Sequence, residues 1–320
     1  MTYSTGGLIQ AADYNTFVGV SNSTTANQLN AVYGVGNGNI GYGQTALSTV
    51  VAGQLVSATN WRNLINVYTA IGNHQSTAIT GVTTPTQGSL IQALAAVSTN
   101  LSNIYTNRLN ASGQAGTYTN TVTNTTSWSS ALTFTHTLTF SSANAARYFF
   151  NAGGQIALTF GHPSGTAINN LWNSLAAACG TIVISAPSSG TASIAGTGYN
   201  GVTKIGGSGS ATTLSTNTGY YALTTSNVEI FKQLSASSTP AGYTSSFISA
   251  SVRSNGTVGS NGDRGSIITI TVVFDEVPNG APGYISAANT TSTVTIRPPS
   301  TSYLANTWGT VTLTGSVTGS

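Results

Sequence analysis

Charged side chains are scarce in this chain. Only 4% of its 320 residues are Asp, Glu, Lys or Arg, whereas ordinary globular proteins carry roughly 25%. The net charge of +3 comes from lysines and arginines that are scattered singly along the chain. No basic cluster is present that could neutralise many phosphates, so the sequence does not predict a nucleic-acid partner.

Cysteine, leader-like segments and long apolar runs are lacking as well. The single Cys179 excludes an intrachain disulfide, and no apolar run reaches the ~18 residues that a membrane span needs. The first residues, MTYSTGGLIQAADY, have neither the positive region nor the apolar core of a secretory signal peptide. We therefore expect no membrane span, and we expect a protein that is made in a cytoplasm and released by lysis as part of a particle.

Small neutral polar residues take the place of the missing charges. Glycine, serine, threonine and asparagine make up half of the chain, so hydroxyls, amides and backbone must cover its surface. Such a composition is also typical of disorder. Disorder is excluded for most of the chain, because β-branched and aromatic residues recur at strand spacing to its end and 39% of the residues are hydrophobic.

Residues 1–112 are predicted to be helical with glycine-rich breaks. Residues 57–72 place Trp61 and three other apolar side chains on one helical stripe, with Gly72 as the expected stop. A second helix is expected over residues 89–109, with Ser89 as its N-cap. Residues 8–17 and 55–64 share a short pattern, which predicts two short helices with Asp13 or Asn60 near their starts. Residues 34–43 are expected to form a loop.

From Tyr118 onward the hydrophobic period changes from helical to two. In residues 131–140 apolar side chains alternate with four threonines, which is typical of a half-buried strand. The segments 266–275, 292–298 and 307–317 follow the same pattern, and an Asn-Gly turn is expected before the first of them. Glycine- and serine-rich segments such as 196–219 are expected to be loops.

Two helices are expected among these strands, over residues 142–153 and 166–180. The second carries Trp172 and Cys179 on one apolar stripe. The predicted fold class is mainly β with α: a helical, glycine-interrupted docking or assembly segment over residues 1–112, followed by a β-sandwich-like domain over residues 113–320 with two inserted helices.

Chemically reactive side chains are few and isolated. Asp275 and Glu276 are neighbours on an expected strand, so they point to opposite faces and cannot form a glycosidase pair; we interpret them as acids at a strand end. His136 lies on an apolar strand face, which is typical of a core histidine. Residues 36–41, GNGNIG, match G-x-G-x-x-G but lack the strand and the acid of a dinucleotide site. The sequence assigns no catalytic, cofactor-binding or metal-binding residue, and neither an enzyme activity nor a cofactor is expected.

Residues 140–156, FSSANAARYFFNAGGQI, differ from their surroundings. They combine an arginine, three consecutive aromatic residues and a Gly-Gly step in a chain with few charges. Ser142 is the expected N-cap of a short helix, and Arg147 is expected to cap carbonyls or to stack on its aromatic neighbour. We interpret the segment as a structural pivot. The expected structural or assembly residues are Trp61, Arg147, Tyr148, Phe149, Phe150, Gly153, Gly154 and Trp172.

The same segment resembles one found in virion structural and fibre-like proteins of tailed bacteriophages, in which an aromatic strand leads through Ser-Ser into an Ala-Arg-Tyr-Phe-Phe-Asn helix and Gly-Gly. Residues 41–75 are similar to a second block of such proteins, marked by Gly-Tyr-Gly-Gln, Trp61, Leu64 and His74-Gln75. The resemblance implies a particle component located in the virion, made in the host cytoplasm, without an assigned reaction, whose partners are copies of itself and other virion proteins.

Three classes of function remain open at the level of sequence. The first is a non-enzymatic virion component that self-assembles, because a surface with few charges has little self-repulsion and little ion desolvation to overcome. The second is a receptor-binding protein or adhesin that uses Tyr199, Tyr220, Tyr221 and Tyr243 against host-surface glycans. The third, a lytic or depolymerase enzyme, is disfavoured by the missing carboxylate pair.

Overall fold

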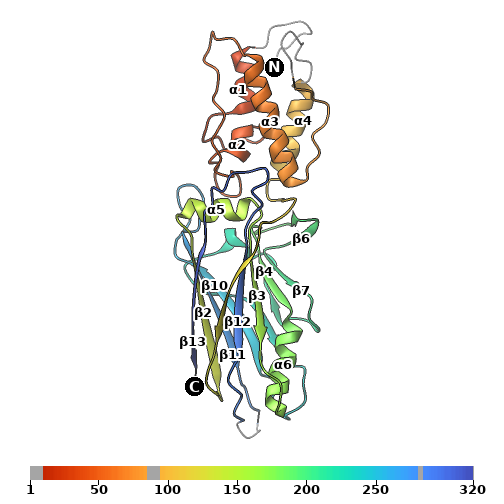
Figure 1. The fold of residues 1–320 in the computed structure, drawn as a ribbon, viewed down its shortest axis with the longest axis vertical. Coiled ribbons are helices and arrows are strands. Elements are labelled where there is room, and N and C mark those ends of the chain that lie inside the picture. The colour runs from red at the N-terminus through yellow and green to blue at the C-terminus, as the bar shows by residue number, and fades with distance from the viewer. Residues whose placement is uncertain (1–9, 85–93, 280–283, 320) are drawn as a thin grey trace.

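The structure of the chain is a computed structural model, which describes residues 10–84, 94–279 and 284–319. The molecule is elongated: four helices lie at one end, two β-sheets fill the other, and a short helix lies between them (Figure 1). The four helices are α1 (Ala11–Val18), α2 (Leu29–Tyr33), α3 (Ala58–Gln75) and α4 (Leu94–Thr106), and the short helix is α5 (Ala143–Asn151). None of the described helices is long and apolar enough to cross a membrane.

Helices α1 and α3 begin in the same way, which explains the internal repeat in the sequence. Asp13 in α1 and Asn60 in α3 each occupy the third helical position and bond back to the backbone of the N-cap residue, forming a capping box. The next residues, Tyr14 and Trp61, are buried and meet edge to face, with ring centroids 5.9 Å apart. The repeated motif therefore starts two helices and supplies the aromatic core between them.

Helix α3 differs from the prediction at its C-terminal end. It continues past Gly72 to Gln75 and ends at Ser76, which has a left-handed backbone (φ 56°). Gly72 is needed for a different reason: a Cβ there would lie 2.6 Å from the Ile79 side chain and 2.8 Å from the Thr77 carbonyl. The glycine lets the following chain pack back onto the helix. The expected N-cap Ser89 lies outside the described residues.

The strands form two main sheets and one hairpin, and all described strand pairs are antiparallel. The five-stranded sheet has the order β1 (Tyr118–Thr123), β12 (Thr291–Arg297), β3 (Gln155–Gly161), β4 (Thr181–Ile184) and β7 (Val202–Ile205). The six-stranded sheet has the order β13 (Thr312–Gly319), β2 (Ala131–Thr139), β11 (Ile267–Asp275), β10 (Phe247–Ser254), β9 (Val228–Leu234) and β8 (Thr213–Leu214). The hairpin pairs β5 (Ala192–Ile194) with β6 (Thr197–Tyr199).

The two large sheets pack face to face. The ring of Phe160 on β3 lies 6.2 Å from that of Phe231 on β9 and 6.1 Å from that of Phe274 on β11. His136 on β2 also reaches across, with its Nε2 2.9 Å from Ser292 Oγ on β12. Inward side chains of both sheets thus share one core, so the fold is β-sandwich-like, as the alternation of apolar residues and threonines predicted.

Two helices are inserted among the strands, also as predicted. Helix α5 follows β2, and helix α6 (Ala167–Cys179) follows β3 and precedes β4. The apolar stripe of α6, including Trp172 and Cys179, is fully buried, and the Trp172 ring lies 5.8 Å from Phe274. Helix α6 therefore packs one face into the sandwich core, while its opposite face, which includes Asn170, Asn173 and Ser174, is exposed.

Two further segments differ from the prediction in their secondary structure. The last strand begins at Thr312 instead of residue 307, because Ala305 and Thr307 bond to residues of the helical end. The segment 196–219, expected to be loop, contains the short strands β6, β7 and β8. The division of the chain at residue 112 into two folding units remains a prediction; a single buried cluster runs from α1 to the sheets.

Candidate functional site

Helix α5 stands where the helical end meets the sandwich, and its boundaries follow from local sequence. The Ser142 Oγ accepts a hydrogen bond of 3.0 Å from the Ala145 backbone and caps the helix. Gly153 has φ 90° and ends it, as predicted. A Cβ at Gly153 would lie 2.5 Å from Ala111, and a Cβ at Gly154 would lie 2.5 Å from the Phe149 ring. The Gly-Gly step is thus required by conformation and by close packing.

Arg147 is completely buried in this contact and binds backbone carbonyls. Its Nη1 donates to the carbonyls of Ile40 (2.7 Å) and Gly38 (3.2 Å), and its Nη2 donates to the carbonyl of Val35. The guanidinium also lies 4.7 Å from the centre of the Tyr148 ring. Both roles expected for Arg147 are therefore present. Because its donors are taken up by carbonyls, the side chain does not offer an anion-binding site.

Asn151, one helical turn after Arg147, binds the same loop. Its Nδ2 donates to the carbonyls of Gly41 (2.9 Å) and Gly38 (3.1 Å). The Tyr221 hydroxyl donates to the Gly38 carbonyl at 2.7 Å. Residues 34–43, a loop as predicted, are thus held by one face of α5 through their backbone.

The Gly-Tyr-Gly-Gln sequence at 41–44 is matched to its neighbours by shape. A Cβ at Gly43 would lie 2.4 Å from the Tyr148 ring, so only glycine fits there. The Gln44 amide pairs with the backbone of Ala305, accepting from its N–H at 2.9 Å and donating to its carbonyl at 2.9 Å. The segment before β13 is thereby tied to the helical end of the molecule.

The C-terminal end of α3 completes the contact. His74 Nε2 lies 3.2 Å from the Ala152 carbonyl at the end of α5, and the Tyr42 ring packs edge-on at 5.4 Å. Burial lowers the pKa of His74 to about 4, so the imidazole is neutral at pH 7 and donates to that carbonyl. Gln75 donates to the Tyr42 hydroxyl at 2.8 Å and to the Ile104 carbonyl at 3.0 Å. We call the residues 34–44, 74–75 and 142–154 together the junction.

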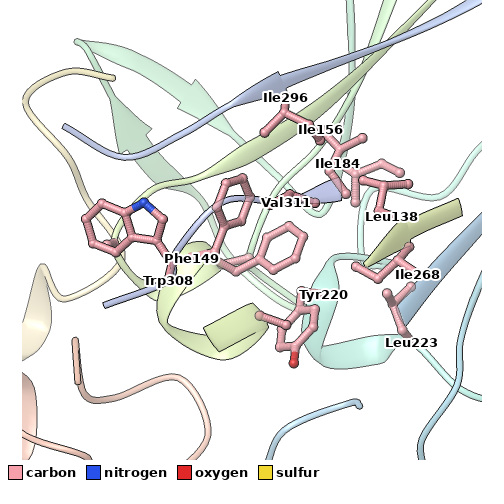
Figure 2. Close-up of a cluster of buried hydrophobic side chains, with 14 of the residues drawn as sticks. Leu138, Phe149, Ile156, Ile184, Tyr220, Leu223, Ile268, Ile296, Trp308 and Val311 are labelled. Carbon is pink, nitrogen blue, oxygen red and sulfur yellow. The ribbon is translucent and has the colours of Figure 1, made fainter. Parts of the chain in front are cut away.

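Phe149 and Phe150 anchor the junction in the sandwich. Both rings are fully buried. Phe149 lies 5.4 Å from Phe140, and Phe150 stacks on Tyr220 at 4.5 Å. Figure 2 shows Phe149 among buried side chains from both sheets, with Trp308 on its other side. Phe149 and Phe150 therefore attach α5 to the sandwich core.

Two of the expected assembly residues lie elsewhere. Trp61 is buried inside the helical end, between Tyr14 and Phe17, and does not belong to the junction. Trp172 is buried in α6, where its ring lies 5.0 Å from that of Trp128. The structure thus brings together Arg147, Tyr148, Phe149, Phe150, Gly153 and Gly154, and separates the two tryptophans from them.

Glu276 is the residue whose environment the sequence reading missed. It is only 5% exposed, and its Oε2 accepts a hydrogen bond of 3.1 Å from Ser286 Oγ, which in turn accepts one from Trp172 Nε1. Burial raises the pKa of Glu276, against the opposing effect of hydrogen bonds led by the one from Ser286. The alternation along β11 could have predicted this burial, because residues 268, 270, 272 and 274 face the core and residue 276 continues the same series.

His136, His162 and Cys179 are buried as well. His136 bonds to Ser292, and His162 bonds to Thr290 at 2.8 Å. Burial raises the pKa of the Cys179 thiol to about 12, which leaves it protonated and unreactive. Among the described residues, no group of three or more His, Cys, Asp or Glu side chains could hold a metal ion.

The tyrosines considered for glycan binding are not available for stacking. Tyr199, Tyr220 and Tyr243 are buried, and Tyr221 is half-buried with its hydroxyl bound to Gly38. Two of the hollows on the molecule lie in the described part of the chain, away from the junction. One, of about 530 Å³, lies beside α1 and the other, of about 260 Å³, beside α6, and neither is lined by an ionisable side chain.

No protein-family model, no curated protein and no solved structure matches the chain.

Proposed function

We propose that this chain is a non-enzymatic structural component of a tailed-phage virion, which self-assembles through subunit interfaces of low charge. The observation that carries the proposal is the junction. The two sequence blocks that resemble phage virion proteins, residues 41–75 and 140–156, contact each other there: Asn151 donates to the Gly41 carbonyl, and His74 donates to the Ala152 carbonyl. Their polar groups serve internal bonds, which fits a building block better than a reaction centre.

The surface of the molecule supports the self-assembly part of the proposal. Of the charged residues, only Arg62, Glu229 and Arg253 are exposed, while Arg147 and Glu276 are buried and the others are half-buried. Copies of such a surface approach one another with little electrostatic repulsion, and little ion solvation is lost when they touch. Contacts between copies would consist of hydroxyls, amides and apolar groups.

The shape of the molecule fits the same role. Hydrogen bonds to carbonyls and stacked aromatic rings join the helical end to the sandwich. The elongated molecule (Figure 1) can therefore act as one rigid unit that contacts neighbouring subunits at both of its ends. A receptor-binding alternative that relies on aromatic contacts with glycans is not favoured, because the four tyrosines are buried or half-buried.

Two measurements test the proposal. Electron microscopy of phage particles labelled with an antibody against this chain should place it on or in the virion. Purified protein, sized by analytical ultracentrifugation across a concentration series, should form oligomers. Absence of label on particles would contradict the virion assignment, and a strictly monomeric protein at all concentrations would contradict self-assembly.

A further inference from the structure

The sandwich has four edge strands in the described part of the chain, and β13 is the longest of them. An edge strand exposes unpaired backbone N–H and C=O groups, and proteins usually protect such edges with charge, proline or short length. In the described chain the edges are β1 and β7 of the five-stranded sheet, and β8 and β13 of the six-stranded sheet. Strand β8 has two residues, and β7 has four and carries Lys204. Strand β1 has six residues and carries no charge and no proline, so only its smaller length distinguishes it from β13.

Strand β13 has none of these protections. It is eight residues long, its sequence TLTGSVTG contains no charge and no proline, and six of its residues are exposed. It pairs with β2 over its whole length, from Thr312 opposite Thr139 to Gly319 opposite Leu132. Its inward side chains Leu313 and Val317 pack on the core. Strand β1 of the other sheet packs against the inward face of β13, where a Cβ at Gly315 would lie 2.3 Å from the Val122 side chain. Among the described strands β13 pairs only with β2, so the backbone groups along its outer edge have no strand partner within the chain.

The outer face beside this edge is uniform and uncharged. Ser316 lies opposite Thr135 of β2, which lies opposite Thr271 of β11, so one row of hydroxyl side chains crosses three strands. Thr314 and Thr318 begin the neighbouring rows, opposite Thr137 and Thr133. No charged group on this part of the face would repel an identical strand placed beside β13.

We propose that β13 is an assembly edge and that its partner is β13 of a second copy of this chain, paired antiparallel about a two-fold axis. The proposal rests on the self-assembly proposed above and names the surface that carries it. Two identical uncharged strands satisfy each other's backbone groups, and the two six-stranded sheets become one continuous sheet. Residues that lie opposite each other in an antiparallel pair point to the same face of the sheet. Outward residues of one β13 must therefore lie opposite outward residues of the other, which requires the two-fold axis to pass through a residue and its own copy rather than between two neighbouring residues. With Ser316 on the axis, Ser316 faces Ser316 of the second copy and Thr314 faces its Thr318.

The test places a charge at that position and at a matched position away from the edge. Ser316→Lys puts two ammonium groups directly opposite each other, whereas Thr271→Lys puts the same charge in the same row, two strands inward. At low ionic strength, Ser316→Lys should associate about fivefold or more weakly than wild type, and Thr271→Lys should associate like wild type. At 1 M salt, where the Debye length is ~3 Å, the Ser316→Lys defect should largely disappear. Sedimentation velocity measures all three proteins.

A charge-reversal pair makes the two-fold geometry explicit. Ser316→Glu alone should be as defective as Ser316→Lys, and an equimolar mixture of the two variants should associate at least as well as wild type. If neither variant weakens association of a wild type that does associate, or if the mixture fails to recover, the β13 pairing is wrong while self-assembly stands. An equal defect in Thr271→Lys would overturn edge pairing in favour of face-to-face packing. A wild type that never associates would overturn the proposed function itself.

Discussion

Replacing Arg147 by methionine tests whether the junction depends on the capping of carbonyls by a buried guanidinium. Methionine preserves most of the volume of the arginine stem but none of its donors. The carbonyls of Val35 and Ile40 then lose the donor that Arg147 provides, whereas the Gly38 carbonyl keeps Asn151 and Tyr221. A buried acceptor without a partner costs about 1–3 kcal/mol, so we expect a loss of about 2–6 kcal/mol in the free energy of unfolding.

Urea unfolding followed by tryptophan fluorescence measures this loss, with Arg62→Met as the matched control. Arg62 is an exposed arginine on α3, so its replacement should change stability by less than about 0.5 kcal/mol. Hydrogen exchange adds a local readout: the Tyr42 and Gly43 amides, which bond to Val32 and Gly34, should lose protection in Arg147→Met. If Arg147→Met is as stable as Arg62→Met, water replaces the guanidinium without cost and the reasoning is refuted.

The remaining predictions concern packing, pH and salt. Phe149→Ala and Phe150→Ala should each cost about 3–5 kcal/mol in urea unfolding, because both rings are fully buried; a folded double variant of unchanged stability would contradict the anchoring role. Burial raises the pKa of Glu276, so its contribution is present at acid pH and is lost as the pH rises through the folded-state pKa; Glu276→Gln should therefore gain stability relative to wild type from pH 4 to pH 8, and an equal difference at both would disprove this. Burial lowers the pKa of His74 from 6.5 to about 4, so roughly 3 kcal/mol of stability should be lost between these values as the pH falls, and His74→Gln should flatten that part of the pH profile. Oligomers of the wild type should keep their size in 1 M salt, where dissociation would reveal ion pairs at the interface.

Local signals in the sequence were sufficient for some of the elements, although not for the short strands within residues 196–219. The Ser142 cap and the Gly153 stop of α5 depend on residues within one turn of the helix ends, and the alternation in residues 131–140 depends only on which face is buried. These features could be predicted because the determining residues are neighbours in the chain. The order of the strands could not be predicted in this way. Strand β12 lies between β1 and β3 in the sheet, although residues 162–290 separate it from β3 in the chain.

The site required contacts over long distances in the sequence. Arg147 was expected to cap carbonyls, but the carbonyls belong to residues more than one hundred positions earlier. Gly72 was wrongly interpreted as the end of a helix. The glycine is required because the Ile79 side chain packs directly against it, and this contact cannot be read from the neighbouring residues. The burial of Glu276 depended on Ser286 and Trp172, although the parity of β11 pointed to it.

The junction also explains why a chain with so few charges can hold two different kinds of structure together. An ion pair at this depth would require two charges to be desolvated, whereas Arg147 and Asn151 bind carbonyls that must find donors in any case. The loop that supplies these carbonyls comes close to α5 because it has glycines at 41 and 43, where a Cβ would clash with Val35 and Tyr148. The close contact between the loop and α5 therefore depends on the absence of a Cβ atom at these two positions. For this reason glycine in residues 34–43, which in composition indicates only a loop, carries as much structural information as the arginine it accommodates.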